Sequence, residues 1–166
     1  INFSNVVNTL DNKVGIKEEF AGWRVQPPLT IPISTGAGAY RAVGRTVALA
    51  YLDQIRHGIR SVLDRASSTS SITELTELWK LVHNENPTGQ SGDPIVVVVS
   101  SLAGGTGAGL LMDVFDTLRA LESWGDHSFG ILYTPEVFAS IGGLMMGGIQ
   151  PNSLAAISEI LNGHYW

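Results

Sequence analysis

The chain has no cysteine and few charged residues. Asp, Glu, Lys and Arg make up 15% of its 166 residues, against about 25% in an average soluble domain. The absence of cysteine excludes disulfide bonds and thiolate metal sites. Because so few charged side chains cannot cover a whole solvated surface, we expect part of the surface to be covered by a partner or by further parts of the same protein.

Clusters of basic residues and long apolar runs are also missing. The net charge is −5 and no Lys/Arg cluster is present, which argues against a nucleic-acid partner bound through its phosphates. No apolar run approaches the roughly 20 residues of a membrane-spanning helix, and no signal peptide is visible. We therefore expect a cytoplasmic protein without a transmembrane segment. The four histidines lack the spacing of metal ligands, so the sequence assigns no metal ligand.

Apolar residues recur at helical spacing in several segments, and β-branched runs lie between them. The predicted elements are a short helix within 3–12, helices over 42–64, 71–82, 110–121 and 151–161, and strands over 29–33, 95–99 and 128–135. The continuous run Ile95–Val99 is typical of a central parallel strand with both faces covered. Strands that alternate with helices predict an α/β fold, with a three-layer, Rossmann-like and mostly parallel sheet that has helices on both faces.

Two glycine-rich loops follow predicted strands. One is "STGAGA" at 34–39, and the other is "AGGTGAG" at 103–109. In parallel sheets, ligands bind beyond the carboxyl ends of the strands. We therefore expect both loops to lie at the same edge of the sheet, where they can share one ligand.

The loop at 103–109 has the composition of a phosphate-binding turn. Its last six residues include four glycines, with Thr106 near the centre. Glycine lets the backbone turn sharply and approach a ligand, and successive N–H groups form a concave nest for anions. The following helix adds the positive end of its dipole. The alternative is a tight strand-to-helix turn whose glycines serve close packing, but four glycines with a threonine favour a phosphate site.

Three types of phosphate loop compete for this segment. The P-loop requires GxxxxGK[ST], and it is excluded because no lysine follows Lys80. The dinucleotide fingerprint requires GxGxxG. Gly105, Gly107 and Gly109 give GxGxG instead, and Leu110 stands where the third glycine belongs, which weakens this second type.

The third type is the signature loop of a known protein family, which this segment resembles. "AGGTGAG" resembles GGGTG[ST]G, the signature loop of the tubulin/FtsZ family, with Ala103 at the first glycine and Ala108 at the usual hydroxyl residue. "GAGAYRAVGR" at 36–45 resembles the GAGANPxxGR stretch of bacterial FtsZ, from which residues 40–42 depart. "ILYTPEVF" at 131–138 is similar to the next strand and its loop, which in this family runs beneath the ribose. The three stretches follow the family's order, so the chain is identified as a divergent tubulin-like protein of bacterial or phage type.

The resemblance implies that GTP or GDP, together with Mg²⁺, binds at the carboxyl edge of the sheet. The residues implied as phosphate-binding are Ala103, Gly104, Gly105, Thr106, Gly107, Ala108 and Gly109, with Gly36, Ala37, Gly38 and Ala39 near the γ-phosphate. Those implied for the ribose and base are Pro135, Glu136 and Asn152. For Asn152 the alternative is a polar helix start beside Pro151, and for Glu136 it is a solvated loop acid. Phosphates and waters would hold Mg²⁺, so no protein ligand is assigned.

The resemblance also implies head-to-tail self-assembly into a homopolymer, in which an acidic loop of the next subunit completes the hydrolytic site. No residue of this chain is assigned as catalytic, and we expect 1–166 to be a single domain that forms an incomplete segment of a larger GTPase domain. Two alternatives stay open. The loops depart from the family's motifs at Ala103, Ala108 and Tyr40. These departures suggest a degenerate tubulin-like scaffold or partner-binding module without hydrolysis. A Rossmann-type nucleotide-binding enzyme is the weaker alternative.

Three charged residues near these loops are predicted to have no part in ligand binding. Arg45 stands at the start of a predicted helix, where we expect a structural or interfacial role and not a phosphate contact. Asp113 and Asp116 fall opposite the apolar stripe of the helix over 110–121. We therefore expect both carboxylates on a solvated helix face.

Overall fold

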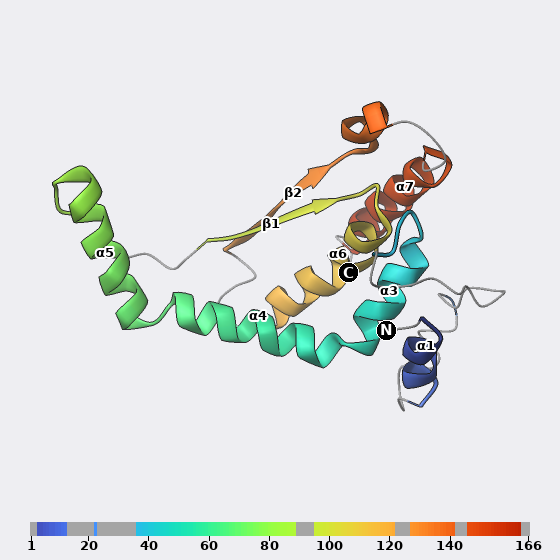
Figure 1. Cartoon of the computed structure of the whole chain (residues 1–166), viewed down its shortest axis with the longest axis horizontal. Helices are drawn as coiled ribbons and strands as arrows, with labels where there is room; N and C mark the ends of the chain where they lie inside the picture. Colours follow the sequence, from blue (N-terminus) through green and yellow to red (C-terminus); the bar gives the residue numbers. More distant parts are fainter. Residues whose placement is uncertain are drawn as a thin grey trace.

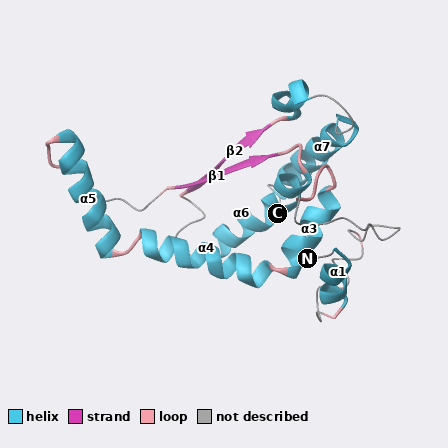
Figure 2. Cartoon of the chain, viewed as in Figure 1, coloured by secondary structure: helices cyan, strands magenta, loops and turns pink. Residues whose placement is uncertain are grey.

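The computed structural model describes residues 3–12, 22, 36–88, 95–121, 127–141 and 146–163. In chain order its elements are α1 (Phe3–Asp11), α3 (Arg41–Ala50), α4 (Leu52–Ala66), α5 (Thr69–His83), β1 (Val96–Ser101), α6 (Gly105–Ala120), β2 (Ser128–Tyr133), the 3-10 helix η2 (Pro135–Ile141) and α7 (Met146–Gly163). Figure 1 labels them and Figure 2 colours them by type. The predicted strand over 29–33 lies outside the described residues.

The two described strands form a parallel pair joined by a helix. Their register runs from Val96 opposite Ser128 to Ser101 opposite Tyr133. The chain leaves β1, passes through α6 and returns in β2, so the segment is a β–α–β crossover unit (Figure 1). Parallel strands require such a crossover, and the predicted α/β class is confirmed.

The two faces of this sheet differ in cover. On one face, Val98 and Leu132 pack against a buried cluster that includes Leu111 of α6 and Ala156 of α7. The exposed side chains of the opposite face are Val97, Val99, Phe129, Ile131 and Tyr133. They alternate with the packed positions, as the two-residue period of a strand requires. The run 95–99 was predicted to be covered on both faces. Among the described residues, only the face that carries Val98 is packed against helices.

The segment 42–64, predicted as one helix, forms two. α3 and α4 meet at Tyr51, whose φ of −112° and ψ of 18° leave the helical region. The Tyr51 N–H is shared between the carbonyls of Val47 and Ala48, which closes α3 with a tightened turn. The one-helix prediction is wrong at this residue, because neither proline nor glycine marks the break in the sequence.

The helix predicted over 71–82 is confirmed as α5, which begins two residues earlier, at Thr69. Its N-cap is Ser68, whose Oγ accepts a hydrogen bond from the Ser71 N–H. Its apolar side chains are exposed, at 63% for Leu75 and 73% for Val82. Figure 1 shows why: α5 projects away from the helices around the sheet.

The last helix begins earlier than the sequence indicates. α7 starts at Met146, five residues before Pro151, which lies inside the helix. Proline lacks an N–H group, so inside a helix it leaves the carbonyl four residues earlier without a donor. Because this cost is absent in the first turn of a helix, the sequence indicated that the helix starts at Pro151. No helix in the described part of the chain is long and apolar enough to cross a membrane.

Candidate functional site

The two glycine-rich loops lie against each other at the carboxyl end of β1. The Gly105 N–H donates to the Gly38 carbonyl at 2.7 Å, and the Ala37 N–H lies 3.5 Å from the Thr106 Oγ1. Figure 1 shows the turn before α3 beside the start of α6. The structure thus brings 36–39 and 103–109 together, as the sequence predicts for loops that share a ligand.

Several backbone N–H groups at this junction have no acceptor. No described residue accepts a hydrogen bond from the amides of Gly104, Thr106 or Gly107, and the same holds for Gly38 and Ala39. The first amides of a helix point out of its N-terminus, where the dipole favours negative charge. Thr106 is exposed in this first turn. The start of α6 therefore offers unused donors to an anion, with no positive side chain needed.

Three of the loop glycines have a packing role. A Cβ at Gly105 would lie 2.6 Å from the Tyr40 carbonyl oxygen, and one at Gly107 would lie 2.5 Å from that of Ser101. A Cβ at Gly109 would lie 2.7 Å from the backbone of α3. The close-packing interpretation therefore holds for these three positions: Gly105 and Gly109 lie against the start of α3, and Gly107 lies against the end of β1.

Gly104 differs from its neighbours because no atom of the described residues lies within 4 Å of the place where its Cβ would be. It is the N-cap of α6, with φ −81° and ψ 156°, a conformation open to any residue. Neither packing nor backbone strain requires glycine there. In the other loop the reason is conformational, because Gly36 and Gly38 have φ of 88° and 54°, a region that favours glycine.

A side chain of α7 joins the two loops. The Asn152 Nδ2 donates to the Ala39 carbonyl at 2.8 Å and to the Ala103 carbonyl at 2.9 Å. Arg41 makes a second link, since its Nε donates to the Ala108 carbonyl at 2.9 Å and its guanidinium pairs with Glu159 of α7. Sequence reasoning missed Arg41, although its departure from the resembled motif was a signal.

Asp113 corrects a prediction, because it is buried and not solvated. It is 6% exposed and forms an ion pair with Arg45 of α3. Burial raises the pKa of Asp113, and the charge of Arg45 opposes that shift. Gly105, Gly109 and Asp113 follow one another at intervals of four, so all three face α3. Because this ion pair joins α3 to α6, Arg45 has the predicted structural role. Asp116 is exposed, as predicted.

The buried carboxyl gives a testable pH dependence. Because the folded-state pKa of Asp113 is raised, its contribution to stability is fully present below its ordinary pKa and falls as the pH rises through the folded value. We expect the free energy of unfolding of the natural protein, measured relative to Asp113→Asn, to increase as the pH is lowered from neutral into the acid range. Urea unfolding of both proteins over a pH series measures this difference. A relative loss of stability toward acid pH would contradict the raised pKa.

The third loop follows β2 at the same sheet edge. Pro135 and Glu136 open η2, with Pro135 buried and Glu136 exposed. Hydrogen bonding to Thr134 and to its own backbone amide lowers the pKa of Glu136. Its carboxylate is therefore charged at neutral pH and able to accept hydrogen bonds. Within the described ranges, no three His, Cys, Asp or Glu side chains gather into a metal site.

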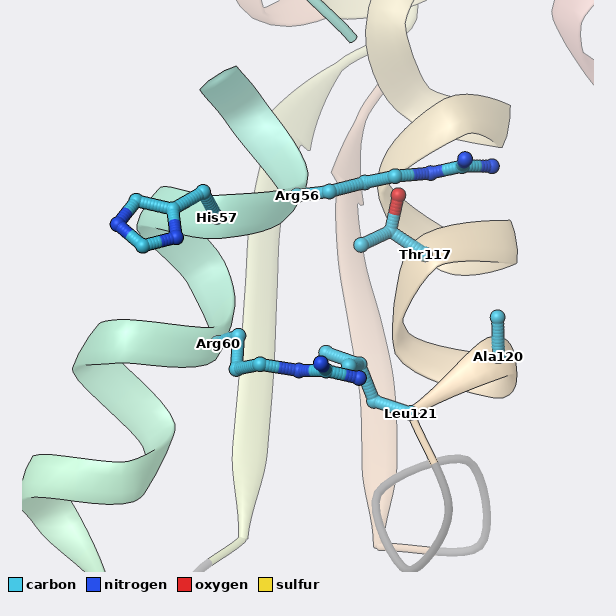
Figure 3. A pocket seen from close by; sticks show the side chains of 6 residues that line it. All are labelled: Arg56, His57, Arg60, Thr117, Ala120 and Leu121. Atoms are coloured by element: carbon cyan, nitrogen blue, oxygen red, sulfur yellow. The ribbon is translucent and has the colours of Figure 1, made fainter. Parts of the chain in front are cut away.

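A pocket of about 400 Å³ lies between α4 and α6, away from the glycine loops (Figure 3). The residues that line it are Arg56, His57, Arg60, Thr117, Ala120 and Leu121. In Figure 3, Arg56 and Arg60 extend toward α6, while His57 turns away from it. The pocket lies at the C-terminal end of α6, where the helix dipole is negative. We therefore interpret the two arginines as stabilising that helix end.

The fold and the loops together define a class of protein. A parallel β–α–β unit with a glycine-rich turn after its first strand, and with unused amides at the following helix N-terminus, is a Rossmann-type α/β architecture suited to anionic ligands. A family model described as "Tubulin like" matches residues 4–165, and the chain belongs to this family. The resemblance seen in the sequence is thereby confirmed. Neither the curated proteins nor the solved structures contain a match.

Proposed function

We propose that this protein binds a guanine nucleotide, GTP or GDP, at the junction of the two glycine loops. The observation that carries the proposal is the group of unused amides at Gly104, Thr106 and Gly107, which meets the first loop at the N-terminus of α6. Such a group fits the oxygens of a polyphosphate. Membership of the tubulin-like family supports the guanine nucleotide as the ligand. Residues 36–39 then lie beside the terminal phosphate.

The ribose and base would lie beyond the carboxyl end of β2. Pro135, Glu136 and Asn152 are the residues we propose for this part of the site. The charged, exposed carboxylate of Glu136 can accept hydrogen bonds from ribose hydroxyls. The Asn152 Nδ2 is already bonded to two carbonyls, so its contact with a ligand would be made by Oδ1 as an acceptor.

Mg²⁺ would enter this site with the nucleotide. Magnesium commonly keeps several waters and is held largely by substrate phosphates. The described residues offer unused amide donors for phosphate and no clustered carboxylates for the metal, which fits that mode of binding. The metal would neutralise phosphate charge, whereas the loop residues would orient the phosphates by hydrogen bonding.

We further propose that the full-length protein hydrolyses GTP when it assembles head-to-tail into a homopolymer in the cytoplasm. An acidic loop supplied by the next subunit would complete the hydrolytic site, with residues 1–166 as part of one larger GTPase domain. A second candidate is a scaffold or partner-binding module without hydrolysis. Ala108 favours it, because this residue is 1% exposed, packs in the core and supplies no hydroxyl where the resembled loop has one.

Hydrolysis measured against protein concentration separates the two candidates. For assembly-coupled hydrolysis, we expect the rate per subunit of the full-length protein to rise steeply with concentration, because each site needs a neighbour. Phosphate release over a hundredfold range of concentration, with light scattering in parallel, measures this. A rate per subunit that stays at background throughout, despite GTP binding, would favour the scaffold.

A further inference from the structure

Asn152 links two loops that are far apart in the sequence. Its Nδ2 donates to the Ala39 carbonyl at 2.8 Å and to the Ala103 carbonyl at 2.9 Å. Both partners are carbonyl oxygens, which can only accept hydrogen bonds. The amino group of the carboxamide must therefore face the loops, and this fixes the orientation of the side chain.

The backbone of α7 is placed to support this contact. Gly148, one helical turn before Asn152, lies so close to the first loop that a Cβ there would be 3.1 Å from the Ala39 Cβ. Ile149, Ser153 and Ala156 are buried on the same helix. Glu159 further along pairs with Arg41, which itself bonds to the Ala108 carbonyl. The helix is thus anchored on both sides of the asparagine.

The contact with Ala103 has a consequence for the next residue. The Ala103 carbonyl and the Gly104 N–H belong to one planar trans peptide unit, so they point in opposite directions. Holding the carbonyl toward Asn152 keeps the Gly104 N–H directed away from α7. A rotation of this peptide would exchange the donor for an acceptor, and a carbonyl oxygen repels a phosphate.

We propose that Asn152 is a positioning residue that holds the Ala103–Gly104 peptide in its donor orientation and keeps the two loops together as one phosphate-binding unit. This inference rests on the proposed guanine-nucleotide site, and it adds a role for Nδ2 to the ribose or base contact proposed for Oδ1 of Asn152. The side chain should then contribute more to the affinity for the nucleotide than to the affinity for the nucleoside, which lacks the phosphates.

The test compares variants of the full-length protein by calorimetric titration with GTP, GDP and guanosine. For Asn152→Ala we expect GTP affinity to fall about tenfold, because the loss of two hydrogen bonds frees the Ala103–Gly104 peptide to leave its donor orientation, and we expect a clearly smaller loss for guanosine. Asn152→Gln, which keeps the carboxamide on a longer side chain, should recover part of the loss. Gln150→Ala is the matched control, because Gln150 is exposed on the same helix, and it should bind like the natural protein.

The outcomes separate the inference from the proposed function. If the natural protein binds no GTP, the proposed function fails and the inference fails with it. If the natural protein binds GTP and Asn152→Ala binds it equally well, only the inference is overturned. An equal loss for GTP and guanosine would also overturn it, because that pattern marks a ribose or base contact. If Asn152→Ala does not fold, Asn152→Ser, which keeps one donor, is compared in the same way.

Discussion

Gly44→Ala is expected to destabilise the protein by about 3 kcal/mol or more, among the larger effects of a single substitution. A Cβ at Gly44 would lie 2.1 Å from the carbonyl oxygen of Gly105 and 2.9 Å from its carbonyl carbon. Both atoms belong to the backbone of α6, so no side chain can move aside to make room. The helices α3 and α6 would have to separate, which would also part the two glycine loops.

A matched control for this substitution lies in α4. Gly58 is in a helix interior, and within the described part of the chain no atom lies within 4 Å of the place where its Cβ would be. Gly58→Ala is therefore expected to stabilise the protein by about 0.5–1 kcal/mol, because alanine is the better helix former. Urea unfolding of the two variants in the full-length protein measures both effects. Equal stability of the two variants would show that α3 and α6 do not cross as closely as described.

Gly104→Asp is expected to abolish nucleotide binding, with a loss of more than about a hundredfold in GTP affinity, while the fold is kept. The new carboxylate would stand at the N-terminus of α6, where it would occupy the helix donors and repel phosphate. The open space at Gly104 and its backbone conformation accept a side chain. Aspartate is also a favoured N-cap residue, so the free energy of unfolding should stay unchanged or rise by a few tenths of a kcal/mol.

The isosteric variant Gly104→Asn isolates the effect of charge. Asparagine has nearly the shape of aspartate and caps helices equally well, but it carries no charge. We expect it to weaken GTP binding less than Gly104→Asp does and to be as stable. GTP titration and thermal unfolding of both variants give the comparison. If Gly104→Asp binds GTP like the natural protein, the N-terminus of α6 does not hold the phosphates.

The sequence carried enough information to pair the two loops. Each loop has a recognisable glycine pattern, and the order of the stretches along the chain matched one family, whose model covers residues 4–165. The strand at 95–99 and the helix after the loop followed from local apolar patterns that need no tertiary information. The glycine pattern could not predict which glycine is needed for packing. The close contact at Gly105 and the open space at Gly104 depend on where α3 lies.

The burial of Asp113 was missed because α6 has two buried sides. Apolar periodicity finds the side that faces the sheet, with Leu111 and Leu118. The side that faces α3 includes Gly105, Gly109 and Asp113. Small and polar residues of this kind give no apolar signal, so a helix-wheel argument assigns them to solvent. The interval of four between the glycines and Asp113 was the available clue.

The link made by Asn152 could not be predicted for a different reason. Its two acceptors lie 113 and 49 residues away along the chain. Hydrogen bonds of such long sequence separation follow from the tertiary fold and leave no local pattern. The helix α5 shows the converse case, because its local signals predict the helix correctly, while the exposure of Leu75 and Val82 depends on where the helix points.

Binding of a guanine nucleotide at the junction of the two glycine loops is tested by the affinity of the full-length protein for a fluorescent GTP analogue, with GTP, ATP and NAD as competitors. We expect saturable binding that GTP displaces and that ATP and NAD do not. Equal displacement by all three competitors, or no saturable binding, would contradict it.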